Sequence, residues 1–187
     1  MAICSLNKSL LRSNICGYQL NDVIAIYLAN FSDISASTTG DCDGTGATQE
    51  GVIVTSVTLV QDAKWSKVEP ARNSAAYSDT LVVTDGGAKY RTHQISFNFN
   101  AAVDCNTPDI VDALSLGKFI AVVTLADGSN VMVGRLAGLE ADTVTLGGEA
   151  GADSANGIQV VLNGNQAEAV LPVSDDVMDS IKANLND

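Results

Sequence analysis

The stretch that decides the fold class is KYRTHQISFNFN, residues 89–100. Its apolar side chains Ile95, Phe97 and Phe99 are separated by single polar residues, so they fall on one side of an extended chain. A period of two residues is typical of a β-strand with one buried face and one polar face. We therefore expect a strand here whose apolar side faces the core.

Further strands are predicted on both sides of this one. The glycines of Asp85-Gly86-Gly87 accept the positive φ of a tight turn, so residues 77–84 are expected to complete a hairpin. Asp127-Gly128 is a second hairpin signal, between apolar stretches at 119–125 and 130–136. The other candidates are rich in β-branched or apolar residues: 23–28, 52–60, 64–68, 143–146 and 157–162. Of these, 52–60 and 64–68 are expected to pair with each other as a hairpin.

Two helices are expected among these strands. Thr107-Pro108-Asp109 opens the first, because Thr can accept an amide hydrogen bond, Pro tolerates the first helical position and Asp complements the helix dipole. Gly117 ends it. Ser174 is expected to cap a second helix over 175–185, whose apolar residues lie on one stripe. Together the patterns predict a mainly β protein, a β-sandwich or barrel of about eight strands with one short flanking α-helix and a C-terminal helix.

The 187 residues are predicted to form one domain, because this length is close to the usual size of a domain with a single core. Residues 1–17 have no sustained period and are interpreted as an N-terminal arm, which the β domain follows over 18–171. Inside that domain, residues 32–51 are rich in Ser, Thr, Gly and Asp, so they are expected to form a long loop without a buried face. The C-terminal helix is assigned to 172–187.

The chain is acidic, yet it contains few charged residues. Its formal net charge is −12 and only 17% of its residues are charged, against about 25% in ordinary soluble domains. Residues 1–100 contain 9 acids and 7 bases, whereas 101–187 contain 13 acids and 3 bases. The ten basic residues are scattered, so the sequence lacks the clustered Lys and Arg that neutralise phosphates. These features argue against specific nucleic-acid binding and favour subunit contacts, although a β-rich monomer with a Ser, Thr and Asn surface would have a similar composition.

The sequence contains no pattern that points to a zinc site or to catalysis. The cysteines are Cys4, Cys16, Cys42 and Cys105. They have no Cys-x-x-Cys spacing and only one histidine accompanies them, so no zinc site is expected. That histidine, His93, shares by parity the side-chain direction of Ile95, and we expect it to be a hydrogen-bonded structural residue at the edge of the core. No enzyme activity, no metal and no cofactor are therefore expected.

Two acidic groups have simple structural explanations. Asp41-Cys42-Asp43-Gly44, followed by Glu50, resembles a fragment of a calcium loop, but the third acidic ligand and the twelve-residue frame are missing. A solvated turn is the preferred interpretation. Asp175-Asp176 is explained as negative charge at a helix N-terminus.

No export or membrane segment is predicted. Polar and basic residues interrupt the apolar positions of residues 1–22, so no targeting peptide is expected. The longest strongly apolar run, 119–123, is far shorter than the roughly 20 residues that span a bilayer. The protein is expected to be soluble, with its cysteines as reduced thiols in a cytoplasm.

The order of several short pieces between residues 52 and 171 carries a family resemblance. The pieces are Val57-x-Leu59 with Lys64-Trp65, His93-Gln94-Ile95-Ser96-Phe97, Leu114-Ser115-Leu116-Gly117, Phe119-Ile120-Ala121-Val122-Val123 with Asp127-Gly128, Gly134, Gly138-Leu139-Glu140-Ala141, and Asp153 to Gly157 with Ile158-Gln159-Val160-Val161-Leu162. In this order the sequence resembles the tail tube and related tail structural proteins of tailed bacteriophages, of the type found in phages of the Bacteroidetes group.

The resemblance implies a virion structural protein. It implies a β-sandwich or barrel flanked by a helix, with copies of the chain closing into rings, expected to be hexameric, that stack into a conduit for DNA ejection. The expected partners are the chain itself and other tail or neck proteins, with DNA passing an acidic lumen without specific binding. The segments expected to reach neighbouring subunits are 1–17, 32–51 and 174–187. The expected location is the virion tail, after synthesis in the bacterial host cytoplasm.

Other functions compete with this interpretation. A neck, ring, connector or capsid-decoration protein of a phage, or the tube protein of a contractile injection system, would share the composition and the β content. A carbohydrate-binding β-sandwich would need an exposed aromatic platform, whereas aromatic residues make up 5% of the chain. Trp65 and Tyr90 are instead expected to be core or interface anchors.

Overall fold

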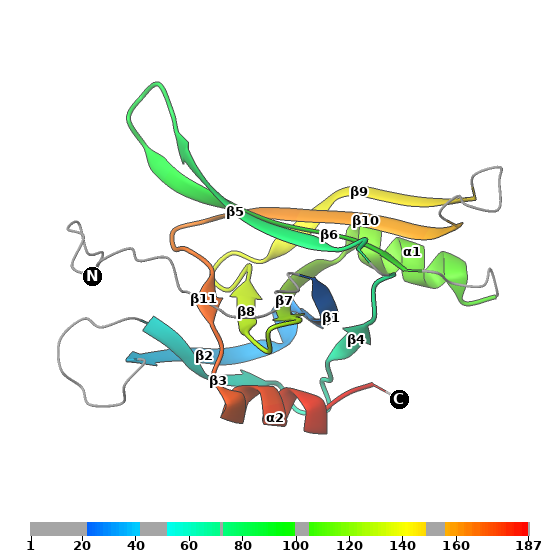
Figure 1. The fold of residues 1–187 in the computed structure, drawn as a ribbon, viewed down its shortest axis with the longest axis horizontal. Helices are drawn as coiled ribbons and strands as arrows, with labels where there is room; N and C mark the ends of the chain where they lie inside the picture. Colours follow the sequence, from blue (N-terminus) through cyan, green and yellow to red (C-terminus); the bar gives the residue numbers. More distant parts are fainter. Residues whose placement is uncertain (1–21, 42–51, 72, 100–104, 149–155, 187) are drawn as a thin grey trace, which may run out of the picture.

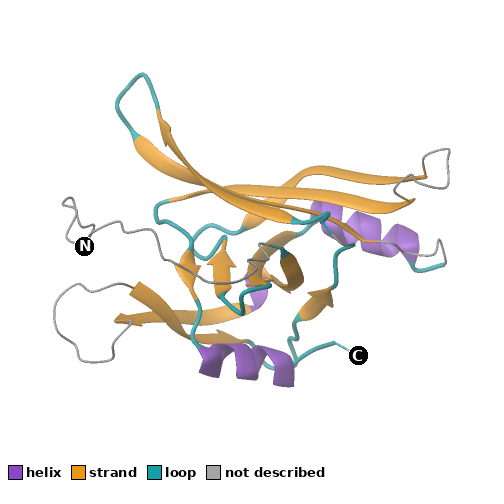
Figure 2. Ribbon diagram, in the orientation of Figure 1, coloured by secondary structure: helices purple, strands orange, loops and turns teal. Residues whose placement is uncertain are grey.

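The computed structural model describes residues 22–41, 52–71, 73–99, 105–148 and 156–186. Within these residues the chain forms a mainly β fold with two α-helices (Figures 1 and 2), so the predicted fold class is confirmed. In chain order the elements are β1 (Val23–Asn30), the 3-10 helix η1 (Phe31–Asp33), β2 (Ile34–Asp41), β3 (Val52–Leu59), β4 (Ser66–Val68), β5 (Ala76–Val83), β6 (Lys89–Phe99), α1 (Thr107–Leu116), β7 (Lys118–Leu125), β8 (Asn130–Val133), β9 (Leu139–Gly148), β10 (Asn156–Gln166), β11 (Leu171–Pro172) and α2 (Asp175–Ala183).

The strands are arranged in three layers (Figure 1). The middle layer has the order β4-β1-β7-β8-β11, and the layer above it has the order β9-β10-β6-β5. The two layers are one continuous sheet, because Lys118 and Phe119 at the start of β7 also pair with the first two residues of β9. The third layer is the separate β2–β3 sheet together with α2.

Two apolar cores lie between these layers. The first core joins the upper and middle layers, and its fully or nearly fully buried residues include Ile26, Leu28, Ile95, Phe97, Ala121, Val123, Ile158, Val160 and Leu162. The second core joins the middle layer to β3 and α2, and its buried residues include Ala25, Tyr27, Val54, Trp65, Ile120, Val122, Met132, Val177, Met178 and Ile181. Successive residues over 25–29 of β1 and 119–123 of β7 therefore point alternately into the two cores. This explains why these two strands are continuous apolar runs, whereas β6 alternates.

The predicted pairing of 52–60 with 64–68 is wrong. β3 pairs with β2 over its whole length, and β4 pairs with β1 through Val68 opposite Ile26. Between β3 and β4 the chain turns at Asp62, which has a φ of 66°, and Trp65 then enters the second core with 2% of its surface exposed. Burial of this large side chain directs β4 to the middle layer instead of back along β3.

The predicted loop over 32–51 is wrong in its first part, because residues 34–41 form β2. None of the β2 side chains is fully buried, as the polar composition indicated. The strand nevertheless forms, because the β-branched residues of β3 offer it an antiparallel partner and its Thr residues suit a pleated surface. The rest of that predicted loop, 42–51, lies outside the described residues.

The helices begin and end close to the predicted residues, but their caps differ from expectation. Asn106 occupies the N-cap of α1, and Thr107 is the first helical residue. Ser174 occupies the N-cap of α2, but its hydroxyl makes no cap hydrogen bond and has no partner among the described residues. The apolar side of α2, rather than its cap, therefore holds this helix on the second core; its buried residues are Val177, Met178 and Ile181.

Candidate functional site

The imidazole ring of His93 is buried between the upper layer and two connecting segments, with 1% of its surface exposed. Its Nδ1 lies 3.2 Å from the backbone N–H of Gly134, and its Nε2 lies 2.9 Å from the carbonyl oxygen of Glu168. A backbone N–H can only donate, so Nδ1 accepts and Nε2 bears the proton that is donated to Glu168. The ring is therefore neutral and joins the β8–β9 turn to the β10–β11 segment.

Charged groups surround this ring without forming a close ion pair with it. The Asp79 Oδ1 atom lies 3.7 Å from His93 Nε2 but only 2.6 Å from the Nε of Arg91. Burial lowers the pKa of His93, and the attraction of Asp79 does not reverse this shift. Burial works against the charged form of Asp79, but the bonds from Arg91 and from the Val170 N–H outweigh it and lower the pKa of Asp79.

The β8–β9 turn is held by two further side chains. Gln166 is 2% exposed, accepts the N–H groups of Leu136 and Ala137, and donates to the carbonyl of Gly138 at 2.9 Å. Arg135 forms a two-pronged ion pair with the Glu168 carboxylate, and its Nε–Oε1 distance is 2.6 Å. We refer to Asp79, Arg91, His93, Arg135, Gln166 and Glu168 as the His93 network.

The geometry of the His93 network fits a structural role. Both ring nitrogens are bonded to backbone groups, which leaves no free nitrogen of the kind that a general base uses. Arg135 also donates to the hydroxyl of Ser37 at 3.3 Å, so the network connects the upper layer to β2. The predicted position of His93, at the core edge and hydrogen-bonded, agrees with this arrangement.

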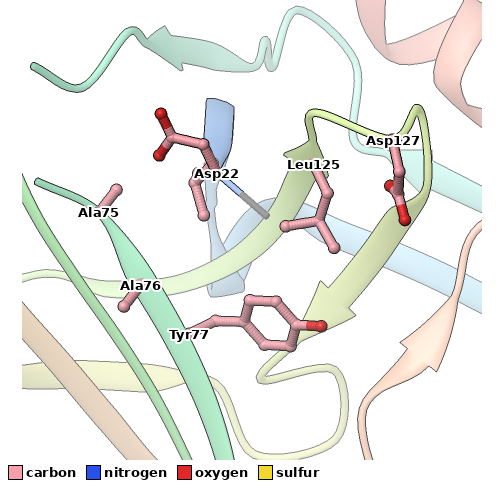
Figure 3. Close-up of a pocket in the computed structure, with 7 residues that line it drawn as sticks. Asp22, Ala75, Ala76, Tyr77, Leu125 and Asp127 are labelled. Atoms are coloured by element: carbon pink, nitrogen blue, oxygen red, sulfur yellow. The ribbon is translucent and has the colours of Figure 1, made fainter. Parts of the chain in front are cut away.

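A hollow of about 450 Å³ opens where β1, β5 and the β7–β8 hairpin meet (Figure 3). The ring of Tyr77 extends from β5 across it, with Leu125 and the two carboxylates of Asp22 and Asp127 around the rim. Asp127 accepts hydrogen bonds from the hydroxyl and the N–H of Ser129, and these bonds lower its pKa. The hollow is open to solvent, and the Asp127 carboxylate is already hydrogen-bonded within its own turn. The geometry of the hollow therefore indicates no specific ligand.

The β5–β6 hairpin is the more informative surface, because its tip extends beyond the rest of the upper layer (Figure 1). The two strands pair without a register shift from Ala76 opposite Ser96 to Val83 opposite Lys89. Leu81 and Val83 are 53% and 56% exposed. Residues 80–90 contain one acid and one base, so an apolar hairpin without net charge projects from a chain with a net charge of −12. We therefore take the tip of this hairpin as the candidate interaction surface.

The β5–β6 hairpin is not among the segments that the sequence predicted to contact neighbouring subunits. The signal was present in Thr80-Leu81-Val82-Val83-Thr84, five consecutive strand-forming residues without a charge. Of the segments that were expected to make contacts, 1–17 and 42–51 lie outside the described residues, and the apolar side of α2 is occupied by the second core.

The other candidate residues are distributed as follows. Trp65 is a core anchor, while Tyr90 is half-buried on the hairpin. Cys105 is an exposed free thiol. Asp43 and Glu50 of the acidic loop lie outside the described residues, and within those residues no group of three or more His, Cys, Asp or Glu side chains could hold a metal ion. No helix in the described ranges is long and apolar enough to cross a membrane.

Comparison with known proteins gives no match to a family model, to a curated protein or to a solved structure. The function is therefore inferred from the residues and from the surfaces described above.

Proposed function

We propose that the chain is a structural subunit of a phage tail tube, in which copies close into rings, expected to be hexameric, and the rings stack into a conduit for DNA. The observation that supports this most directly is the projecting β5–β6 hairpin with its exposed Leu81 and Val83. A monomer would leave these side chains and the outer edge of β5 in water, whereas contact with a neighbouring subunit would cover both.

The charge distribution favours the same proposal. Copies with a net charge of −12 repel one another over most of their surface. The hairpin has no net charge over residues 80–90, so a neighbouring copy can approach there without like-charge repulsion. Acids elsewhere on the assembled rings would repel DNA phosphates, which suits a lumen that DNA traverses without binding.

The hydrogen bonds and ion pairs of the His93 network support a non-catalytic role. Its polar groups bond to one another and to backbone groups, and they tie three layers together. Layers joined in this way suit a repeating assembly, because neighbouring copies must meet with the same geometry. On this proposal the protein resides in the virion tail after synthesis in the host cytoplasm.

Negative-stain electron microscopy of the purified chain over a range of concentrations tests the proposal. We expect stacked rings or hollow tubes. Isolated rings that never stack would indicate a neck or connector component, and dispersed monomers at high concentration would refute self-assembly.

A pair of variants tests whether the hairpin is the contact. Val83→Asp places a carboxylate opposite Lys89, so the hairpin is expected to fold but its apolar surface is interrupted. Leu116→Asp is the control, because Leu116 is 86% exposed on α1, away from the hairpin. We expect Val83→Asp to abolish tubes and Leu116→Asp to leave them intact. Equal effects of the two variants would refute the role of the hairpin.

A further inference from the structure

The open edges of the sheets indicate how one copy would bind the next. Edge strands expose unpaired N–H and C=O groups, and natural proteins usually protect them with short length, charge, proline or a covering segment. In the described residues, β11 is two residues long and ends at Pro172, and β4 is three residues long with Lys67 at its centre. The outer side of β3 is approached by the segment before α2, where the Ser174 N–H donates to the Val54 carbonyl.

β9 pairs with β7 only through Leu139 and Glu140, and the rest of its outer side has no strand partner among the described residues. Asp142 places a charge on this strand, and α1 packs against it. Each of these edges therefore has one of the usual forms of protection.

Two long edges lack such protection. β5 and β2 are eight residues long, and each has a ladder partner on one side only among the described strands. Residues 34–40 of β2 contain no charged residue, and residues 80–83 of β5 contain none either. The one charge within β5, Asp79, is already bonded to Arg91 and to the Val170 N–H.

The two edges belong to different layers on opposite sides of the molecule (Figure 1). If β5 paired with β5 of a second copy, the assembly would stop at a dimer and both β2 edges would stay open. If β5 pairs with β2 of the next copy, each added copy presents a fresh edge, which is the head-to-tail contact that closes rings or extends stacks.

We propose that the β5 edge of one copy pairs with the β2 edge of the next copy, so that the sheets continue from subunit to subunit. This inference rests on the proposed self-assembly and specifies the contact within it. Main-chain hydrogen bonds along the two edges supply the binding, as in other cases of strand addition. The exposed Leu81 and Val83 next to the β5 edge would be covered by the added subunit.

Cross-linking between single-site cysteine variants tests the pairing. Thr80→Cys places a thiol in β5, and Thr39→Cys places one in β2; both positions are exposed. The native cysteines stay in place, and mass spectrometry assigns the linked peptides after treatment with a short bis-maleimide. We expect the 80-to-39 product only when the two variants are mixed under conditions that give tubes.

The outcomes separate this inference from the proposed function. An 80-to-80 product from Thr80→Cys alone would establish β5–β5 contact and overturn the inference. Tubes without any 80-to-39 product would also overturn it while leaving the tube proposal standing, whereas the absence of assemblies would refute both.

Hydrogen exchange on the native chain is a second test that needs no substitution. On assembly, we expect hydrogen exchange to become slower at backbone amides of both β2 and β5. We expect the exchange rates of the β4 amides to stay the same. Protection of only one of the two edges would contradict the proposed pairing.

Discussion

Gly164 offers a sharp test of how the His93 network is packed. This glycine lies in β10 opposite His93, and a Cβ atom added there would meet the carbonyl oxygen of Gly138 at 2.2 Å. That oxygen has little freedom to move, because the amide of Gln166 donates to it at 2.9 Å. Gly138 has a φ of 72°. This backbone conformation forms the turn that brings the Gly138 carbonyl toward β10.

The expected cost of Gly164→Ala follows from this contact. Overpacking by one methyl group in a closely packed region typically costs about 1–3 kcal/mol. For a chain of this length, 1 kcal/mol lowers Tm by roughly 2–4 °C, so we expect a decrease of about 2–12 °C. Gly147→Ala is the matched control, because Gly147 also lies in a strand but its added Cβ would meet only the Thr145 Cγ2 atom at 4.0 Å.

Urea unfolding would measure both variants at a concentration where sedimentation shows monomers, so that assembly does not contribute to the free energy of unfolding. Wild-type protein at the same concentration is the reference. If the free energies of unfolding of Gly164→Ala and Gly147→Ala differ by less than about 0.5 kcal/mol, the β8–β9 turn can shift away from the added methyl group at little cost. That result would refute the claim that Gln166 holds the turn in place.

Two further predictions concern the core and the pH dependence of stability. Burial lowers the pKa of folded His93 below its ordinary value of 6.5, so the unfolded chain binds the proton more readily; we expect the His93 contribution to be fully present above pH 6.5 and to decline as pH falls below that value toward the folded pKa. Denaturant midpoints between pH 7.5 and 5 would measure this, and an equally steep loss in His93→Gln would show that another group is responsible. Trp65→Ala should lower the free energy of unfolding by about 3–5 kcal/mol, because Trp65 is 2% exposed in the second core. Leu116→Ala, at a residue that is 86% exposed, is the control and should stay within about 0.5 kcal/mol of wild type; similar losses in both would contradict the assigned core.

Local patterns in the sequence were sufficient for most of the elements, though not for β2, and for the two hairpins with tight turns. The alternation around Ile95 and Phe97 predicted the strand β6 with one buried face, and Asp85-Gly86-Gly87 and Asp127-Gly128 marked the turns that the structure contains. These features depend on residues that are close in sequence, so side-chain periodicity and turn chemistry define them directly. The continuous apolar runs of β1 and β7 likewise indicated strands, since both faces of these strands are buried.

The tertiary structure alone decided which distant segments meet. The sequence predicted that β3 pairs with β4, but β4 pairs with β1, next to the buried Trp65, and β3 pairs with β2. His93 is bonded to backbone groups 41 and 75 residues away, and no spacing in the sequence encodes those partners. The open edges of β5 and β2 also became visible only once the strand order of both sheets was known. The propensity to form a strand depends mainly on a few consecutive residues. Strand pairing is non-local, so it depends on how the whole chain fills its cores.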